Sequence, residues 1–165
     1  MRKSAGQSLV EFALILPLLL MLLFGIIDLG WYVFNYAQVN QAVRNGAEAA
    51  AQLPPYPEVL NNTTYQNDDP CYRRIAKAAQ DQAIIPNVRD LLSVSYPTGS
   101  RDIGEPIQVQ IIYTIQPLTP LFQTLIPIGN NGQFVFTARS VRSIESLGFI
   151  PPTTEDPDGD VCYQP

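Results

Sequence analysis

Two acidic side chains stand at the ends of a long apolar stretch, where a carboxylate is energetically costly. Glu11 precedes the uncharged run from Phe12 to Ile27, and Asp28 follows it. An acid at the centre of a bilayer costs about 3 kcal/mol on insertion scales, and such residues usually have partners. In a helix Asp28 lies roughly 24 Å beyond Phe12, so we expect a solvated carboxylate at the outer interface. Glu11 lies nearer the inner edge, where partial solvation is an alternative.

Cys71 and Cys162 are the only two cysteines, and both follow the apolar stretch. If this part of the chain lies outside the cytoplasm, a disulfide between them would persist. It would pin the C-terminal tail to a helix start near Pro70. Two free thiols are the alternative, because spacing alone does not show that the cysteines meet.

Enzymatic chemistry has little support in this sequence. The chain contains no histidine, which removes the commonest general base and metal ligand. It contains no G-x-S-x-G, phosphate-binding glycine loop or haem-attachment motif. The acidic segment 155–160 spaces its carboxylates as calcium loops do, but it lacks the glycine and the final glutamate of such loops. We therefore predict a non-enzyme without cofactor or metal, and a solvated acidic turn in the tail.

The element that carries Glu11 and Asp28 is predicted to be a membrane-spanning helix. Residues 9–34 exceed the roughly 20 apolar residues that a span requires. The backbone must satisfy its own hydrogen bonds in lipid, so we expect a helix despite Pro17. A cleaved secretory signal is the rival interpretation, but the run is longer than a signal core and no small-residue cleavage site follows closely.

The orientation of this helix follows from its flanks. Arg2 and Lys3 precede it, and basic residues there favour a cytoplasmic N-terminus. Trp31, Tyr32 and Tyr36 would form an aromatic belt at the opposite interface. The remainder of the chain is therefore expected to lie outside the cytoplasm, anchored in a cell membrane by one span.

The run Gly6-Gln7-Ser8-Leu9-Val10-Glu11-Phe12, continuing into the apolar stretch, resembles the N-terminus of type IVb prepilin-like proteins, specifically the TadE-like family. The resemblance implies that a prepilin peptidase cuts after Gly6, that Gln7 becomes the N-terminus, and that Glu11 is the matching assembly glutamate. A neighbouring subunit's α-amine would then balance Glu11. If residues 1–6 are retained, Arg2, Lys3 or another protein must do so.

A second similarity lies far downstream. The segment Tyr113-Thr114-Ile115-Gln116-Pro117-Leu118-Thr119-Pro120-Leu121, with the following strand-like residues 133–143, resembles the Y-x-x-x-P-L-T-P-L segment and closing strand of TadE-like ectodomains. The two similarities together span most of residues 5–145. Residues 54–69 and the tail after residue 150 have no counterpart.

The region outside the span is acidic. Residues 1–34 carry two of the ten basic and two of the fifteen acidic residues, so residues 35–165 hold the whole formal charge of −5. The absence of a basic patch argues against a nucleic-acid partner. About 100–110 residues remain for one compact domain.

Hydrophobic patterning predicts an α+β fold for that domain. Small apolar residues from Val39 to Leu53 recur with helical spacing, so the membrane helix should continue as an amphipathic stalk of roughly 67 Å counted from Ser8. Residues 54–69 are rich in Pro and Asn and are expected to form a loop. Asp69-Pro70 predicts a helix start, with the helix closing at Pro86. Strands are expected at 91–96, 107–116 and 133–143, as an antiparallel meander with two helices on one face.

Two functions fit this organisation. The first is a minor pilin or pseudopilin that acts in pilus assembly or secretion by packing its N-terminal helix against other membrane subunits. The second is an accessory structural subunit of a larger respiratory or photosynthetic membrane complex, with an uncleaved pilin-like anchor. The predicted regions are a cytoplasmic N-terminus (1–8), a transmembrane helix (9–34), a stalk (35–53), a TadE-like ectodomain (54–149) and an acidic, proline-rich tail (150–165).

Overall fold

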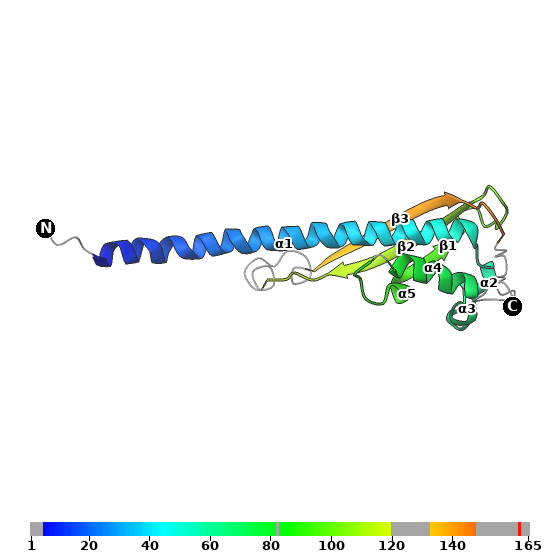
Figure 1. Cartoon of the computed structure of the whole chain (residues 1–165), viewed down its shortest axis with the longest axis horizontal. Helices are drawn as coiled ribbons and strands as arrows, with labels where there is room; N and C mark the ends of the chain where they lie inside the picture. The colour runs from blue at the N-terminus through cyan, green and yellow to red at the C-terminus, as the bar shows by residue number, and fades with distance from the viewer. Residues whose placement is uncertain (1–4, 82, 120–132, 148–161, 163–165) are drawn as a thin grey trace. The chain divides into compact units, whose positions relative to one another are not determined.

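The computed structural model describes residues 5–81, 83–119, 133–147 and Cys162 (Figure 1). The elements are α1 (Ala5–Gln52), α2 (Pro57–Leu60), α3 (Thr63–Asp68), α4 (Pro70–Gln80), α5 (Val88–Leu91), β1 (Leu92–Ser95), β2 (Pro106–Ile115) and β3 (Phe134–Ser143). The α+β class is confirmed: a long apolar N-terminal helix accompanies a three-stranded antiparallel sheet and further short helices.

Helix α1 contains 48 residues and continues through Pro17 without a break. It therefore includes both the predicted span and the predicted stalk. It ends where Leu53 is followed by two prolines, which supply no N–H groups. The last carbonyls find other donors: Ala51 accepts from the Glu145 and Ser146 amides at 2.7 and 3.3 Å, and Gln52 accepts from the Ser146 hydroxyl.

The segment before α4 is not the loop that its composition predicts, because it holds two short helices. Pro57 begins α2 and supplies a preset φ at the first helical position. In α3, the Asn62 side chain caps the helix by accepting from the Thr64 amide at 2.9 Å. A Pro- and Asn-rich composition therefore marked helix starts here as well as turns.

Helix α4 starts as predicted and ends earlier than predicted. The Asp69 carboxylate accepts from the Tyr72 amide at 2.9 Å, which confirms the N-cap. The helix stops at Gln80 rather than near Pro86. The Gln80 amide donates to the carbonyls of Ala83 and Ile85 and its oxygen accepts from the Val88 amide, so one side chain organises the turn into α5.

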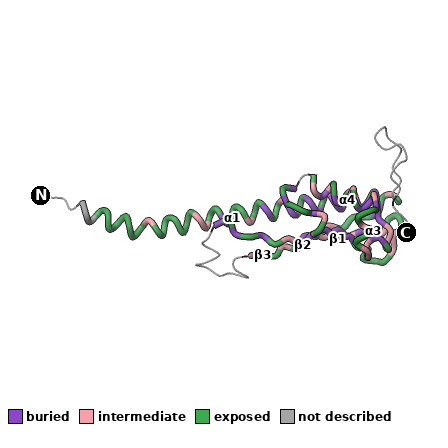
Figure 2. Tube along the Cα trace, turned by 90° about the horizontal axis from the view of Figure 1, so that it is seen from below, coloured by how far each residue is buried: buried purple, intermediate pink, exposed green. Residues whose placement is uncertain are grey.

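The sheet has the order β1-β2-β3, and β1 pairs antiparallel with β2 so that Leu92 faces Ile111 and Val94 faces Val109. The outer half of α1 and helix α4 pack with the buried side chains of the sheet in one core (Figure 2). The predicted apolar stripe is buried in this core, at Val39, Ala42, Val43, Gly46 and Ala50. Small residues suit this position because they allow close approach: a Cβ atom on Gly46 would lie 3.4 Å from both Ala79 Cβ and Val109 Cγ1.

The chain divides into two compact units, which are treated separately below. In the described parts, the first contains residues 5–35 with 114–119 and 133–134, and the second contains residues 36–81, 83–113 and 135–147 with Cys162.

Candidate functional site: the membrane helix and its docked segment

The proposed processing site and the assembly glutamate lie in the first turns of α1. The helix begins at Ala5, so Gly6, Gln7 and Glu11 are all helical. Positions 7 and 11 are one turn apart and share a face of the helix. The Glu11 side chain is exposed, at the start of the apolar run.

From Leu9 to Ile27 the residues of α1 are nearly all apolar and mostly exposed, and Figure 2 draws this part of the helix mostly in the colour of exposed residues. Among the described residues it is the one helix long and apolar enough to cross a membrane, and none of its most apolar window is buried. A helix that is apolar all round is expected to lie in lipid or within a protein core. The large exposed side chains before Asp28 include Leu9, Val10, Phe12, Leu14, Ile15, Leu18, Leu19, Leu22 and Ile26.

Asp28 is not the solvated interfacial carboxylate that its position predicts. Its exposure is 0%. Its Oδ1 accepts from the backbone amides of Leu118 and Thr119, both at 2.9 Å, and its Oδ2 accepts from the Thr119 hydroxyl. Three donors therefore take the place of water around this carboxylate, which is what a buried charge requires.

The aromatic residues next to Asp28 extend this contact. The Trp31 indole donates to the Gln116 carbonyl at 3.1 Å, and its own carbonyl accepts from the Asn35 amide at 2.8 Å. The Tyr32 ring meets Phe134 edge to face at 4.9 Å between centroids. Thus Trp31 and Tyr32, predicted as a membrane-interface belt, also bind the returning chain.

These bonds bring the downstream TadE-like segment against α1, just beyond the apolar run whose start resembles the N-terminus of that family. Residues 116–119 of the downstream segment lie against α1 between Asp28 and Trp31, whereas Pro120 and Leu121 lie outside the described residues. Sequence analysis did not predict this pairing. A signal was present, since a lone acid in an apolar helix requires donors, and a Leu-Thr pair between two prolines offers a hydroxyl and two amides.

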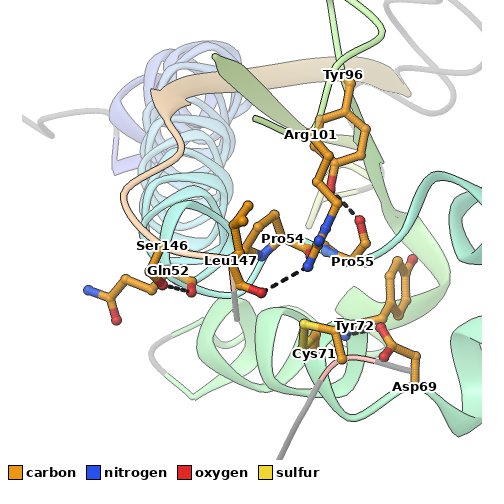
Figure 3. Close-up of a disulfide and its surroundings, with 11 residues drawn as sticks. Gln52, Pro54, Pro55, Asp69, Cys71, Tyr72, Tyr96, Arg101, Ser146 and Leu147 are labelled. Carbon is orange, nitrogen blue, oxygen red and sulfur yellow. Dashed lines mark hydrogen bonds between the residues drawn. A yellow bond between two sulfur atoms is a disulfide. The ribbon is translucent and has the colours of Figure 1, made fainter. Parts of the chain in front are cut away.

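The cysteines that the sequence pairs are joined in the second unit (Figure 3). Cys71 and Cys162 form a disulfide with their Cα atoms 5.1 Å apart, across 91 residues of sequence. Leu53 and Tyr56, just beyond the end of α1, pack around it. The bond therefore ties the first turn of α4 to the C-terminal region beside the end of the long helix.

Arg101 and Tyr96 hold the same end of α1. The Arg101 guanidinium donates to the carbonyls of Pro54 (2.8 Å) and Leu147 (3.0 Å), and it lies 4.0 Å from the centre of the Tyr56 ring. The Tyr96 hydroxyl donates to the Pro55 carbonyl, as Figure 3 shows. Burial raises the pKa of the Tyr96 hydroxyl, against the opposing influence of Arg101. The hydroxyl therefore stays protonated and remains a donor.

Metal chemistry finds no support in the described residues: no group of three or more Cys, Asp or Glu side chains there could hold an ion. The acidic segment 155–160, considered above for calcium, lies outside the described residues.

The family model described as TadE-like protein matches residues 6–48, which include the proposed processing site, the apolar helix and part of the stalk. The resemblance is confirmed for this segment, and it indicates a pilus-associated protein with an N-terminal membrane-type helix. The family is structural and is not known as enzymatic. No curated protein and no solved structure matches the chain.

Proposed function

We propose that this chain, TadE-like over residues 6–48, is a non-catalytic single-pass membrane protein that acts as a minor pilin or pseudopilin in pilus assembly or secretion. The observation that carries the proposal is the family match on a helix whose apolar side chains before Asp28 are mostly left exposed by the described chain. Lipid covers such a surface before assembly, and helices of other pilus subunits cover it afterwards.

The proposed orientation places residues 1–8 in the cytoplasm and the folded domain outside. Arg2 and Lys3 support this direction. The disulfide between Cys71 and Cys162 supports it independently, because structural disulfides belong to oxidising compartments.

Maturation is proposed to occur by a prepilin peptidase between Gly6 and Gln7. Intact-mass measurement on protein purified from native membranes tests this step. A chain that begins at Gln7 supports the pilin assignment. A chain that retains residues 1–6 in a stable complex with unrelated subunits would overturn it and support the accessory-subunit alternative, which no observation on the structure favours.

Glu11 is proposed to serve assembly rather than insertion. Glu11→Ala should reduce co-purification of other pilus subunits while leaving the amount of membrane-inserted protein unchanged, because a neutral residue is easier to insert. Glu48→Ala is a matched control, since Glu48 is an exposed acid further along the same helix. Undiminished co-purification of the Glu11→Ala variant would contradict the role.

A further inference from the structure

The segment 116–119 runs alongside α1 toward the N-terminal part of that helix, which is the part proposed to lie in the membrane. Gln116 bonds to Trp31, whereas Leu118 and Thr119 bond to Asp28, three residues nearer the N-terminus. Three residues of helix correspond to about 4.5 Å. The descending chain therefore reaches the level at which the uncharged run of α1 ends.

Between Pro117 and Pro120 the backbone of this segment has its amide donors satisfied, as a position against lipid demands. Pro117 and Pro120 have no N–H group. The two amides between them, from Leu118 and Thr119, both donate to Asp28. No N–H group from residue 117 to residue 120 therefore needs water.

The side chains of the segment alternate in exposure. Pro117 and Thr119 are buried, whereas Leu118 is 60% exposed. On α1 near the same level, Leu29 and Val33 are 64% and 60% exposed. Exposed apolar side chains therefore occur at this level on both α1 and the returning segment.

We propose that residues 116–119 form a lipid-interface contact, in which Asp28 holds the backbone and Leu118 enters the outer leaflet at the boundary between headgroups and acyl chains. Asp28 acts as a positioning residue. The inference rests on the proposed membrane anchor, and its partner is the lipid–water interface of the outer leaflet.

Tryptophan quenching tests this contact, because Trp31 is the only tryptophan in the chain. The full chain is reconstituted in phosphatidylcholine vesicles that carry bromine at shallow or deep acyl positions. The reporters are placed in a Trp31→Phe background, which removes the indole bond to Gln116 but leaves the Asp28 bonds to Leu118 and Thr119 to which the proposal assigns the positioning. In this background, Leu118→Trp should emit at short wavelength and be quenched by shallow bromines. Ile103→Trp, at an exposed apolar position of the second unit, should emit as in water and remain unquenched.

A third reporter separates failure of the contact from failure of the anchor. Leu20→Trp, in the same Trp31→Phe background, should be quenched by deep bromines if α1 spans the bilayer. If the Leu20→Trp reporter is quenched and the Leu118→Trp reporter is not, the lipid contact is wrong and the anchor stands. If neither reporter is quenched, both are wrong.

Asp28→Asn tests the positioning role. The amide keeps the size of the side chain but weakens the acceptor. The substitution should therefore abolish most of the quenching of the Leu118→Trp reporter while quenching of the Leu20→Trp reporter is retained. Retained disulfide and helical circular dichroism would show that the variant folds. Full quenching of the Leu118→Trp reporter in the folded Asp28→Asn variant would overturn the role of the carboxylate.

Discussion

The two halves of α1 use the same secondary structure for opposite purposes. Up to Phe34 the helix is rich in large side chains, most of which are exposed, and its one fully buried acid is bound by backbone amides. From Val39 to Ala51 the side chains on one face are small and buried against α4 and the sheet. In the proposed function, the large exposed apolar residues meet lipid and other subunits, whereas the small buried ones let the sheet approach the helix. The first half therefore contributes to where the protein resides and the second half to whether its domain folds.

Among the predictions, loss of the disulfide should lower the stability of the folded domain the most, without affecting the membrane helix. In the chain-entropy description, a bond that closes a loop of 91 residues stabilises the folded state by about 4.6 kcal/mol. Cys71→Ser should lower the free energy of unfolding of the domain by this order and leave membrane insertion unchanged. Denaturant titration in detergent micelles measures the first, and carbonate extraction of membranes measures the second.

Two controls accompany this prediction. The Cys71→Ser/Cys162→Ser double variant should be no less stable than the single variant, because both lack the same bond. Thiol titration of the denatured, unreduced wild-type chain should detect no free thiol. Two titrated thiols would show that the bridge does not form.

A matched pair of apolar truncations tests the contrast between the halves directly. Ile111 is fully buried in the core and faces Leu92 across the sheet, so Ile111→Ala should cost about 2–5 kcal/mol of domain stability. Leu14 is 70% exposed in the first half of α1. Leu14→Ala should leave the domain's denaturant midpoint unchanged, and a comparable loss in both variants would contradict the separation.

The parts of this fold that sequence analysis predicted depend on local patterns. The apolar run and the small-residue stripe predict α1, Asp69-Pro70 predicts the start of α4, and alternation predicts β2. Each pattern depends on which side chains of a single segment are buried, and hydrophobic periodicity indicates this within the segment.

The features that sequence analysis missed depend on contacts between distant segments. Asp28 binds amides 90 and 91 residues away. Its residue type signals that donors are needed but not which backbone amides supply them. Gln80 ends α4 because its side chain reaches the carbonyls of the following turn. In both cases the partner is main chain, which hydrophobic patterning does not reveal.

Two glycines on α1 offer a finer version of the same contrast. Gly46 faces Ala79 and Val109, whereas a Cβ atom on Gly25 would meet nothing within 4 Å. Gly46→Leu should overpack the core and lower domain stability by about 1–3 kcal/mol. Gly25→Leu should not lower the stability of the domain, because the added side chain would meet no neighbouring part of the chain. Equal stability losses, measured by denaturant titration, would show that the first half is packed as tightly as the second.

The smallest predicted effect concerns the hydrogen bond from the Tyr96 hydroxyl to the Pro55 carbonyl, next to the C-terminal end of α1. Tyr96→Phe should cost about 1 kcal/mol at neutral pH, because the Pro55 carbonyl loses its donor. Tyr36→Phe on α1 is the control, since Tyr36 is half exposed.

The pH dependence gives this last prediction a distinct signature. Burial raises the pKa of Tyr96, and of Tyr72, above the ordinary value of about 10. Above that pH the unfolded chain releases these protons first, so stability is full below pH 10 and falls by at most about 1.4 kcal/mol per pH unit for each such tyrosine. Tyr96→Phe should reduce the slope, since one of the two groups is removed. An unchanged slope in Tyr96→Phe, measured by denaturant titration between about pH 9 and 11, would show that the Tyr96 hydroxyl does not stabilise the end of α1 in its protonated form.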